Sequence, residues 1–465
     1  MPAELRGRGY FFLPSTPNHM VAGDLRAGED GVFVDLDGTF QELGELVGVR
    51  ASYGLMHGVL ADGKRVSLHH VYQVGAHLGG YARESWRITE CVVGANLPEH
   101  PTFDEMQFEF DHLPDWFPRT GLTAAAGQDG PRSTRITSSP PSELRATLGD
   151  GNTIAIGFGG ELHKERHLAQ VRERIIGRAQ CVHPLLAREL TERYLVPLRD
   201  LITFATLVPA IVEEVAVRAP LRAITAEDGT AAKMPMPIFL PLLQPAPDLR
   251  EPAPLRPDRI LFSLDDWPGS FEELMQAWWG FRDHHSSALS ILLGLSYAPP
   301  RWSDSQTLAW AQAFEAYHRI EFSASPATTR ASERYERVTA SCPGGDREWL
   351  RVRLEHADDP SLRNRVREIS DRVASIVDPL PTQHADFANR LSDVRNLYAH
   401  FGAVAEASGG ASGAELYILA EVAHWVFLAN VLLDLGFEEE KAKGLVQRNA
   451  YFRHLVENPA PLPLG

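Results

Sequence analysis

Three polar residues near the end of the chain have the types and the spacing needed to act on a phosphodiester. They are Arg395, Asn396 and His400. Around them, apolar residues recur at alternating intervals of four and three positions: Phe387, Leu391, Val394, Tyr398 and Phe401. This spacing predicts an amphipathic helix from about Pro381 to Phe401, with the polar residues on its opposite face. Residues four apart on a helix lie one turn apart, so Asn396 and His400 share a face and Arg395 can reach both.

Each of these side chains brings a property that RNA cleavage requires. A histidine titrates near neutrality, so His400 can take a proton from a ribose 2′-hydroxyl or give one to the departing 5′-oxygen. The guanidinium of Arg395 stays charged and can stabilise the extra negative charge of a pentacoordinate phosphorane. We therefore expect no metal and no other cofactor at this site. We also expect RNA rather than DNA as substrate, because DNA lacks the attacking 2′-hydroxyl.

The segments around these residues resemble those of the HEPN superfamily of helical ribonucleases. The HEPN signature is an arginine, four to six intervening residues and a histidine, often with an asparagine directly after the arginine, as in Arg395 to His400 here. A Gly-rich break at Ser408–Gly413 precedes an apolar run, Ala414–Gly436, that looks like the long helix after the motif. The earlier segment Leu308–Ile320 looks like the opening helix of the same bundle. The resemblance spans roughly the last third of the chain.

The resemblance implies a homodimer in which two Arg-x4-His motifs face each other across one composite cleft. His400 would then be the general acid and base, Arg395 the phosphate-stabilising cation and Asn396 a positioning donor. Glu315, on the predicted opening helix, is a candidate for orienting the arginine or the histidine. A solvent-exposed helical glutamate remains the alternative, because glutamate is a good helix former. Tyr398 belongs to the apolar stripe and is expected in the core.

Length and composition limit the remaining possibilities. A chain of 465 residues suggests two or three domains at ~150 residues each. With 44% hydrophobic and 23% charged residues it has the composition of a soluble globular protein. The net charge of −16 argues against a broad basic surface for nucleic acid, so any RNA contact must be local. Arginines between Arg330 and Arg372 alternate with acidic residues, which predicts a solvated, salt-bridged helical face.

Cysteine spacing and hydropathy indicate a cytoplasmic protein. Three cysteines, Cys91, Cys181 and Cys342, lie far apart and fit no zinc-binding spacing. The first ten residues hold no apolar signal core. The apolar run Leu201–Val217 is too short to span a bilayer and contains a proline and glutamates. We therefore expect reduced thiols and no membrane association.

The N-terminal part of the chain has the pattern of a β-sandwich or barrel. Glycine-containing turns at Gly23–Gly31 and Gly58–Gly63 lead into short β-branched runs, and further strands are expected in three places: Trp86–Val93, Gln107–Phe110 and Thr153–Phe158. The segment Phe108–Phe117, with the early runs Phe11–Pro14 and Val21–Leu25, resembles the N-terminal β-domain of ApeA-type antiphage proteins. That resemblance implies antiphage defence, in which this part senses a phage-derived trigger or restrains the nuclease.

One motif supports a different enzyme. The run Val32–Thr39 matches the first motif of haloacid-dehalogenase phosphatases, in which Asp35 would be the nucleophile and Asp37 the acid and base. Such a fold would continue with strand–helix units, whereas this chain continues with hairpin signals. An Asp-Gly turn after a strand is the favoured interpretation, and an all-β environment around Asp35 would exclude the phosphatase.

The histidine clusters are not interpreted as metal ligands. Three clusters occur: His69-His70, His163 with His167, and His284-His285. The second lacks the glutamate of the zinc-protease pattern, and adjacent histidines should point apart. We interpret them all as surface or capping residues.

Together these patterns predict an α+β protein in three parts. Residues 1–255 form a β-rich sandwich-like or barrel-like regulatory domain with some helix, chiefly Leu185–Thr206, and a strand at Val212–Arg218. The proline-rich stretch from Pro235 to Pro257 is expected to be a loop. Residues 256–300 form a helical connector with helices after Ser270 and around His285–Leu295. Residues 301–465 form an all-α HEPN bundle, with further helices at Asp346–His356 and Ser361–Val377.

The predicted function is that of a metal-independent endoribonuclease in antiphage defence. Two alternatives stay open at this point: a non-catalytic HEPN module for binding or dimerisation, and the phosphatase based on Asp35 and Asp37.

Overall fold

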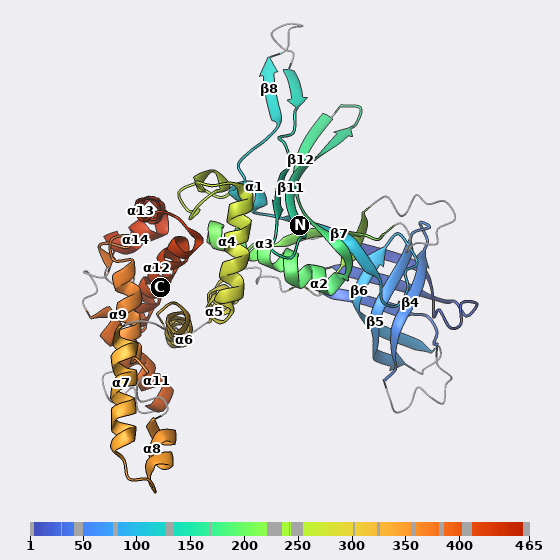
Figure 1. Ribbon diagram of the computed structural model, residues 1–465. Coiled ribbons are helices and arrows are strands. Elements are labelled where there is room, and N and C mark those ends of the chain that lie inside the picture. Colours follow the sequence, from blue (N-terminus) through green and yellow to red (C-terminus); the bar gives the residue numbers. More distant parts are fainter. Residues whose placement is uncertain are drawn as a thin grey trace. The chain divides into compact units, whose positions relative to one another are not determined.

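The structure is a computed structural model that describes most of the chain. The described residues are 4–28, 30–40, 50–77, 82–126, 134–167, 169–220, 235–240, 242, 254–300, 303–322, 326–354, 359–380, 386–401 and 412–458. Contacts divide the chain into two compact units that interleave along the sequence (Figure 1). The β unit comprises Met1–Ile202, Pro209–Pro254 and Ser270–Gln276, and the helical unit comprises Thr203–Val208, Leu255–Gly269 and Ala277–Gly465. The three-part division at residues 255 and 300 stays a prediction.

The first six strands close into a barrel, drawn in blue in Figure 1. These strands are β1 (Leu5–Phe12), β2 (Val21–Gly28), β3 (Gly31–Leu36), β4 (Ser52–Leu60), β5 (Arg65–His77) and β6 (Arg83–Val93). Their order is β6-β3-β2-β1-β4-β5, and β5 also pairs with β6, which completes the ring. Alternate side chains point inward, so Leu25, Val34 and Trp86 are fully buried in one apolar core. Of the two predicted β architectures, the barrel is the one found.

A second group of strands continues the sheet. It contains β7 (Thr102–Phe110), β10 (Leu144–Thr147), β11 (Thr153–Lys164), β12 (Ala169–Leu186), β13 (Val212–Arg218) and β14 (Met236–Phe239). The order is β10-β11-β12-β7-β13-β14, and the short β14 also pairs with β6 of the barrel. A separate antiparallel ribbon consists of β8 (Leu122–Ala126) and β9 (Thr134–Ser138), and the short helix α1 (Leu113–Trp116) follows β7.

Several predicted boundaries in the β unit are wrong. Gly23–Gly28 is part of β2 rather than a turn, because these residues pair with Gly31–Leu36 of β3. The helix predicted from Leu185 begins at Ala187, since β12 stays paired with β7 up to Leu186. The predicted strand Val212–Arg218 is confirmed as β13.

The helix after β12 is continuous but changes its winding. It consists of α2 (Ala187–Leu190), a π-helical turn at Thr191–Leu195 and α3 (Val196–Thr206). Within the proline-rich loop predicted further on, Met236–Phe239 forms β14. Pro237 fits there because the strand pairs over only two residues on each side.

The helices after residue 270 cover the predicted connector and the predicted C-terminal bundle. They are α4 (Phe271–His284), α5 (Ser286–Tyr297), α6 (Ser303–Glu321), α7 (Pro326–Ser341), α8 (Arg347–Leu354), α9 (Leu362–Arg372), α11 (Phe387–Phe401), α12 (Gly413–Leu435), α13 (Glu439–Arg448) and α14 (Ala450–Glu457). Helix α6 is central, because it packs against α5, α9, α11 and α12. Its Phe314 and Tyr317 are fully buried. The predicted N-cap at Ser270 is confirmed, since its hydroxyl accepts from the Glu273 amide at 3.2 Å.

Helix α12 is the buried core helix of this bundle. It begins after Ser412, whose side chain accepts from the Glu415 amide, and ends at Gly436, whose φ of 101° is left-handed. Among the described residues it is the one helix long and apolar enough to cross a membrane by length and composition, with mean hydropathy 1.8. Since 78% of that window is buried inside the bundle, its apolar surface already has protein partners.

Candidate functional site

The predicted site is carried by α11, which is shorter than expected. Asp386 has a φ of 67°, a left-handed conformation that a helix cannot continue through, so the helix begins at Phe387. Residues 381–385, at the predicted start, lie outside the described residues. Phe387, Leu391 and Val394 are buried as the apolar stripe predicts. Tyr398 is only partly buried, so its assignment to the core is wrong in degree.

Three of the four predicted residues lie together: Arg395 and Asn396 on the polar face of α11, and Glu315 on the neighbouring helix α6. The Arg395 guanidinium donates to a Glu315 carboxylate oxygen at 3.3 Å and to the Asn396 side-chain oxygen at 3.2 Å. Glu315 is on α6, one of the helices against which α11 packs. The side chains of Arg395 and Glu315 remain 34% and 27% exposed. The guanidinium is therefore held in place but still open to solvent on one side.

His400 occupies the next turn of the same helix. Its backbone is part of α11, four residues after Asn396. Its side chain lies outside the described residues, as do residues 402–411 of the glycine-rich break.

A second cluster beside this face was missed by the sequence analysis. His318 on α6 contacts the Glu368 carboxylate at 2.8 Å, and Arg365 donates to the Pro360 carbonyl oxygen at 2.8 Å. Arg365 is only 5% exposed, so the prediction of a solvated arginine face is wrong there. The signal was available, because Arg365 lies three residues after Leu362 and four before Ile369 and so shares their buried face. Burial lowers the pKa of both His318 and Arg365.

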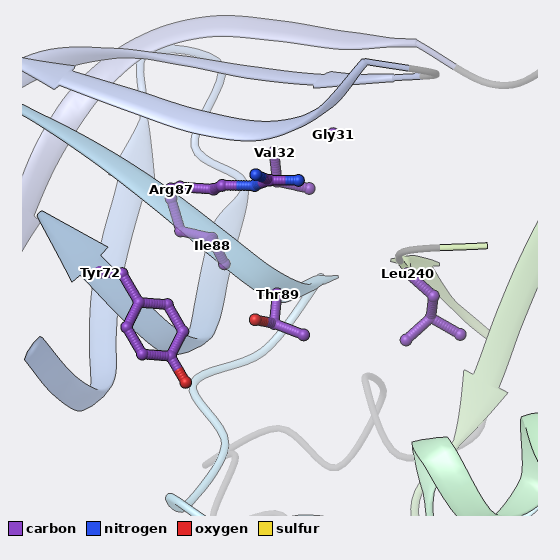
Figure 2. A pocket seen from close by; sticks show the side chains of 7 residues that line it. All are labelled: Gly31, Val32, Tyr72, Arg87, Ile88, Thr89 and Leu240. Atoms are coloured by element: carbon purple, nitrogen blue, oxygen red, sulfur yellow. The ribbon is translucent and has the colours of Figure 1, made fainter. Parts of the chain in front are cut away.

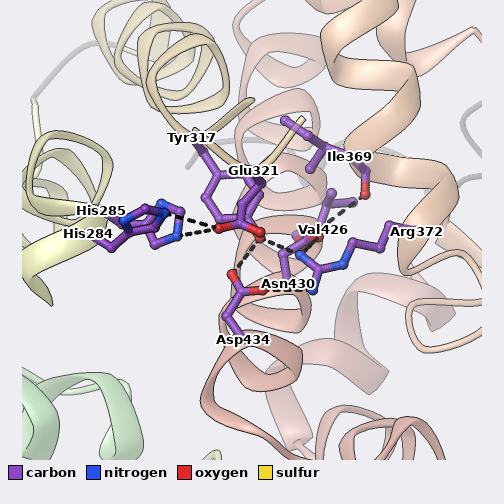
Figure 3. A network of polar contacts seen from close by, with 9 residues as sticks. All are labelled: His284, His285, Tyr317, Glu321, Ile369, Arg372, Val426, Asn430 and Asp434. Atoms are coloured by element: carbon purple, nitrogen blue, oxygen red, sulfur yellow. Dashed lines mark hydrogen bonds and ion pairs between the residues drawn. The ribbon is translucent and has the colours of Figure 1, made fainter. Parts of the chain in front are cut away.

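A third polar cluster lies inside the bundle (Figure 3). Arg372 on α9 donates to Asp434 at 2.7 Å and to the Tyr317 hydroxyl at 2.6 Å, and that hydroxyl donates to Asp434 at 2.5 Å. Asn430 donates to the carbonyl oxygens of Ile369 at 3.2 Å and Val426 at 2.8 Å. Burial opposes the charge of Arg372, but Tyr317 and Asp434 outweigh it and raise the Arg372 pKa. These groups satisfy one another and join α6, α9 and α12.

The phosphatase alternative is wrong. Asp35 lies on β3, which pairs antiparallel with β2 and β6, so the motif is not on the parallel strand that such an enzyme requires. Asp35 accepts from Arg26 and from the Ser85 hydroxyl, both at 2.7 Å. Asp37 accepts from Arg8 at 2.8 Å. Both carboxylates therefore form ion pairs on the barrel surface.

The histidine clusters differ from the prediction in two places. His69 is 1% exposed, and burial lowers its pKa to about 4, so it is not a surface residue. His284 and His285 do not point apart, because both rings approach the Glu321 carboxylate (Figure 3). His163 is exposed and contacts Glu165 at 2.9 Å, as a surface histidine would.

The β unit has an open cavity of about 400 Å³ on the outside of the barrel (Figure 2). Its lining is mainly apolar, with one cation and one phenol: Gly31, Val32, Tyr72, Arg87, Ile88, Thr89 and Leu240. None of the predicted catalytic residues lines it.

A helical bundle with an Arg-Asn-x3-His helix, preceded by a barrel-containing β unit, defines a HEPN-type protein with an N-terminal β-rich region. Comparison with protein families agrees. Residues 308–441 match the family described as Apea-like HEPN, and residues 7–278 match the family described as ApeA N-terminal domain 1. The second match covers more than half of the chain, so the chain belongs to the ApeA family. No curated protein and no solved structure shows a significant match.

The two matches confirm the resemblance inferred from the sequence, in its order along the chain as well as its kind. They support a HEPN-type antiphage defence protein.

Proposed function

We propose that this protein is a metal-independent endoribonuclease that cleaves cellular RNA when a phage-derived trigger is present. The observation that carries the proposal is the Arg395 guanidinium on the polar face of α11. It is oriented by Glu315 at 3.3 Å and Asn396 at 3.2 Å, yet about a third exposed, inside the segment that matches Apea-like HEPN. An arginine fixed in this way is prepared to receive a phosphate with little further loss of side-chain freedom.

The proposed reaction is a transesterification followed by release. Neutral His400 takes the proton of a ribose 2′-hydroxyl, and the 2′-oxygen attacks the adjacent phosphorus. Arg395 stabilises the charge of the phosphorane, and Asn396 positions a phosphate oxygen. The bond from phosphorus to the 5′-oxygen then breaks, and that oxygen receives a proton from the protonated His400 of a second copy. The products carry a 2′,3′-cyclic phosphate and a 5′-hydroxyl.

A homodimer follows from this scheme, because it uses two motifs across one composite cleft. We propose that the β unit senses the trigger or restrains cleavage, and that the reaction takes place in the cytoplasm. RNA is the substrate, and the net charge of −16 means that contact is confined to the cleft.

The test is cleavage of total cellular RNA in EDTA by the full chain, comparing wild type with His400→Ala. His454→Ala on α14 is the matched control, since that histidine is exposed in the same unit. We expect cleavage by wild type and by the control, products ending in a 2′,3′-cyclic phosphate, and a loss of at least about 100-fold in His400→Ala. Equal cleavage by all three proteins would contradict the assignment. Because a restrained enzyme needs its trigger, the same proteins are also tested in phage-infected cells.

The alternative is a non-catalytic HEPN module whose helical unit only binds or dimerises. That hypothesis predicts that folded His400→Ala retains full protection against phage.

A further inference from the structure

Two consecutive histidines at the junction of α4 and α5 converge on one carboxylate of α6. His285 Nε2 lies 2.8 Å from a Glu321 carboxylate oxygen, and His284 Nε2 lies 4.0 Å from the same oxygen (Figure 3). The chain bends between the histidines, because His284 ends α4 and His285 occupies the N-cap position of α5. The rings meet edge to face, with centroids 4.9 Å apart. This bend is why the two side chains do not diverge as they would along a regular helix.

The distances suit a small metal ion. One donor atom from each residue lies within 4.8 Å of the other two. A tetrahedral zinc ion with bonds of about 2.1 Å separates its ligand atoms by about 3.4 Å. The two measured separations from Glu321, 2.8 and 4.0 Å, lie on either side of that value. Each of these two separations differs from the tetrahedral value by about 0.6 Å, a shift that side-chain rotation can supply.

The surroundings fix one ligand and leave another accessible. His285 is 2% exposed and lies against the rings of Phe281 at 4.7 Å and Tyr317 at 5.0 Å, so its orientation is set by packing. His284 is 66% exposed, which leaves a route for an ion and for water. A rigid buried ligand next to an open one is the arrangement of a site that loads from solvent.

The charge balance also favours a cation here. Among the described residues, the ion pairs of Glu321 are with these two imidazoles, whereas nearby Asp434 has Arg372 at 2.7 Å. The Glu321 side chain is 28% exposed, so its charge is partly removed from water. Arg372 attracts it electrostatically but donates its hydrogen bonds to Tyr317 and Asp434. A divalent ion would give Glu321 a cation in direct contact.

We propose that His284, His285 and Glu321 form a binding site for a divalent transition metal, with Zn²⁺ as the best match to two imidazoles and one carboxylate. Three protein ligands leave one position for water. The ion would tie the α4–α5 junction to the end of α6, the helix that also carries Glu315. Glu315 and Glu321 are six residues apart, about 9 Å along the helix axis and on different faces. The site is therefore separate from the proposed RNA cleft and stabilises the helix that supports it.

The test measures metal binding, so its outcome is independent of ribonuclease activity. The full chain is stripped with EDTA, dialysed and titrated with Zn²⁺, and Co²⁺ serves as a spectroscopic probe of tetrahedral coordination. We expect about one ion per chain and a rise in Tm with Zn²⁺. His284→Ala and Glu321→Gln should weaken binding at least tenfold, because even groups that only orient metal ligands contribute that much.

His454→Ala is the matched control and should bind like wild type. Substitution of exposed His284 leaves the packing intact, whereas His285 is buried and its loss would confound folding with binding. Absence of binding by wild type, or equal binding by wild type, His284→Ala and Glu321→Gln, would overturn the proposal.

Discussion

Two arginines of the helical unit each face a carboxylate, yet they differ in how deeply their partners are buried. Arg372 donates to the Tyr317 hydroxyl at 2.6 Å and to Asp434 at 2.7 Å, and Asp434 is only 9% exposed. Arg395 donates to its partners at 3.2 and 3.3 Å, and about a third of its side chain faces solvent. The two arginine side chains are themselves almost equally exposed, at 30% and 34%, so the difference lies in their partners. Arg372 joins three helices through buried groups, whereas Arg395 contacts a partly exposed carboxylate and an exposed amide.

This difference separates stability from function within one bundle. A guanidinium has five N–H donors in a fixed plane, so the role of an arginine depends on the acceptors that surround it. Removing Arg372 leaves buried acceptors without a partner, and removing Arg395 leaves mostly solvent-exposed groups. Substitution of Arg372 should therefore lower stability, whereas substitution of Arg395 should lower RNA cleavage.

The largest expected effect is on catalysis at Arg395. Arg395→Ala should lower RNA cleavage about 100- to 1000-fold, because the phosphorane loses its stabilising cation. The free energy of unfolding of this variant should stay within about 0.5 kcal/mol of wild type, since Arg395 and its partners are partly exposed. Single-turnover cleavage and urea unfolding measure the two quantities. A variant that loses stability and activity together would show that Arg395 is a structural residue like Arg372.

The next largest effect is on stability at Arg372. Arg372→Ala should lower the free energy of unfolding by roughly 3 kcal/mol, because Asp434 and the Tyr317 hydroxyl lose their buried donor. Arg372→Met preserves most of the volume and distinguishes lost packing from lost charge. Urea unfolding of both variants measures the effect. Wild-type stability in both would mean that the network adds nothing to the fold.

A smaller effect is expected at Glu315. Glu315→Gln keeps the size of the side chain but weakens its hold on Arg395, and should reduce kcat about fivefold, or about 1 kcal/mol, at unchanged Tm. Glu333→Gln on α7 is the matched control, since Glu333 is exposed. A positioning role predicts partial recovery with Glu315→Asp. If kcat is unchanged in Glu315→Gln, the contact with Arg395 has no part in the reaction.

The smallest effect concerns Asp266, a carboxylate shared by two cations. Its side chain contacts Arg448 at 2.5 Å and Lys441 at 3.1 Å, and although partial burial opposes its charge, these partners hold its pKa well below the usual range. A carboxyl whose pKa is depressed in the folded state stabilises the protein above its unfolded pKa, about 3.9, and loses that contribution as the pH falls further. Asp266→Asn should therefore cost under about 1 kcal/mol at pH 7.

Urea unfolding between pH 7 and pH 2.5 checks this sign. The difference between wild type and Asp266→Asn should shrink as the pH falls below about 4. A difference that grows towards low pH would contradict the assigned direction of the pKa shift.

Local patterns in the sequence predict elements well when they are long and periodic. The stripe at Phe387, Leu391 and Val394 is buried, and α12 ends at Gly436, where the predicted apolar run also ends. In both cases the signal lies within one segment. Closure of the barrel by β5 and β6, by contrast, depends on which distant strands pair, and a period of two says only which face is buried.

The candidate site was predictable in type but not in its surroundings. The sequence placed Glu315 on a neighbouring helix, and the structure adds the distance to Arg395. Burial of Arg365 was missed although Leu362 and Ile369 share its helical face. Convergence of His284 and His285 on Glu321 was missed because it depends on the bend between α4 and α5 and on packing against α6.

The short strand β14 has a mechanical consequence for the β unit. It joins the barrel to the rest of the sheet through two residue pairs on each side: Ala216↔Pro237, Val217↔Met236, Ile238↔Val92 and Phe239↔Cys91. Each backbone hydrogen bond contributes about 1 kcal/mol net, so this seam is far weaker than the long pairings within either half. Under a pulling force the unit should part along β14 first, with the barrel still closed. β14 is therefore expected to be the mechanically weakest connection within this sheet.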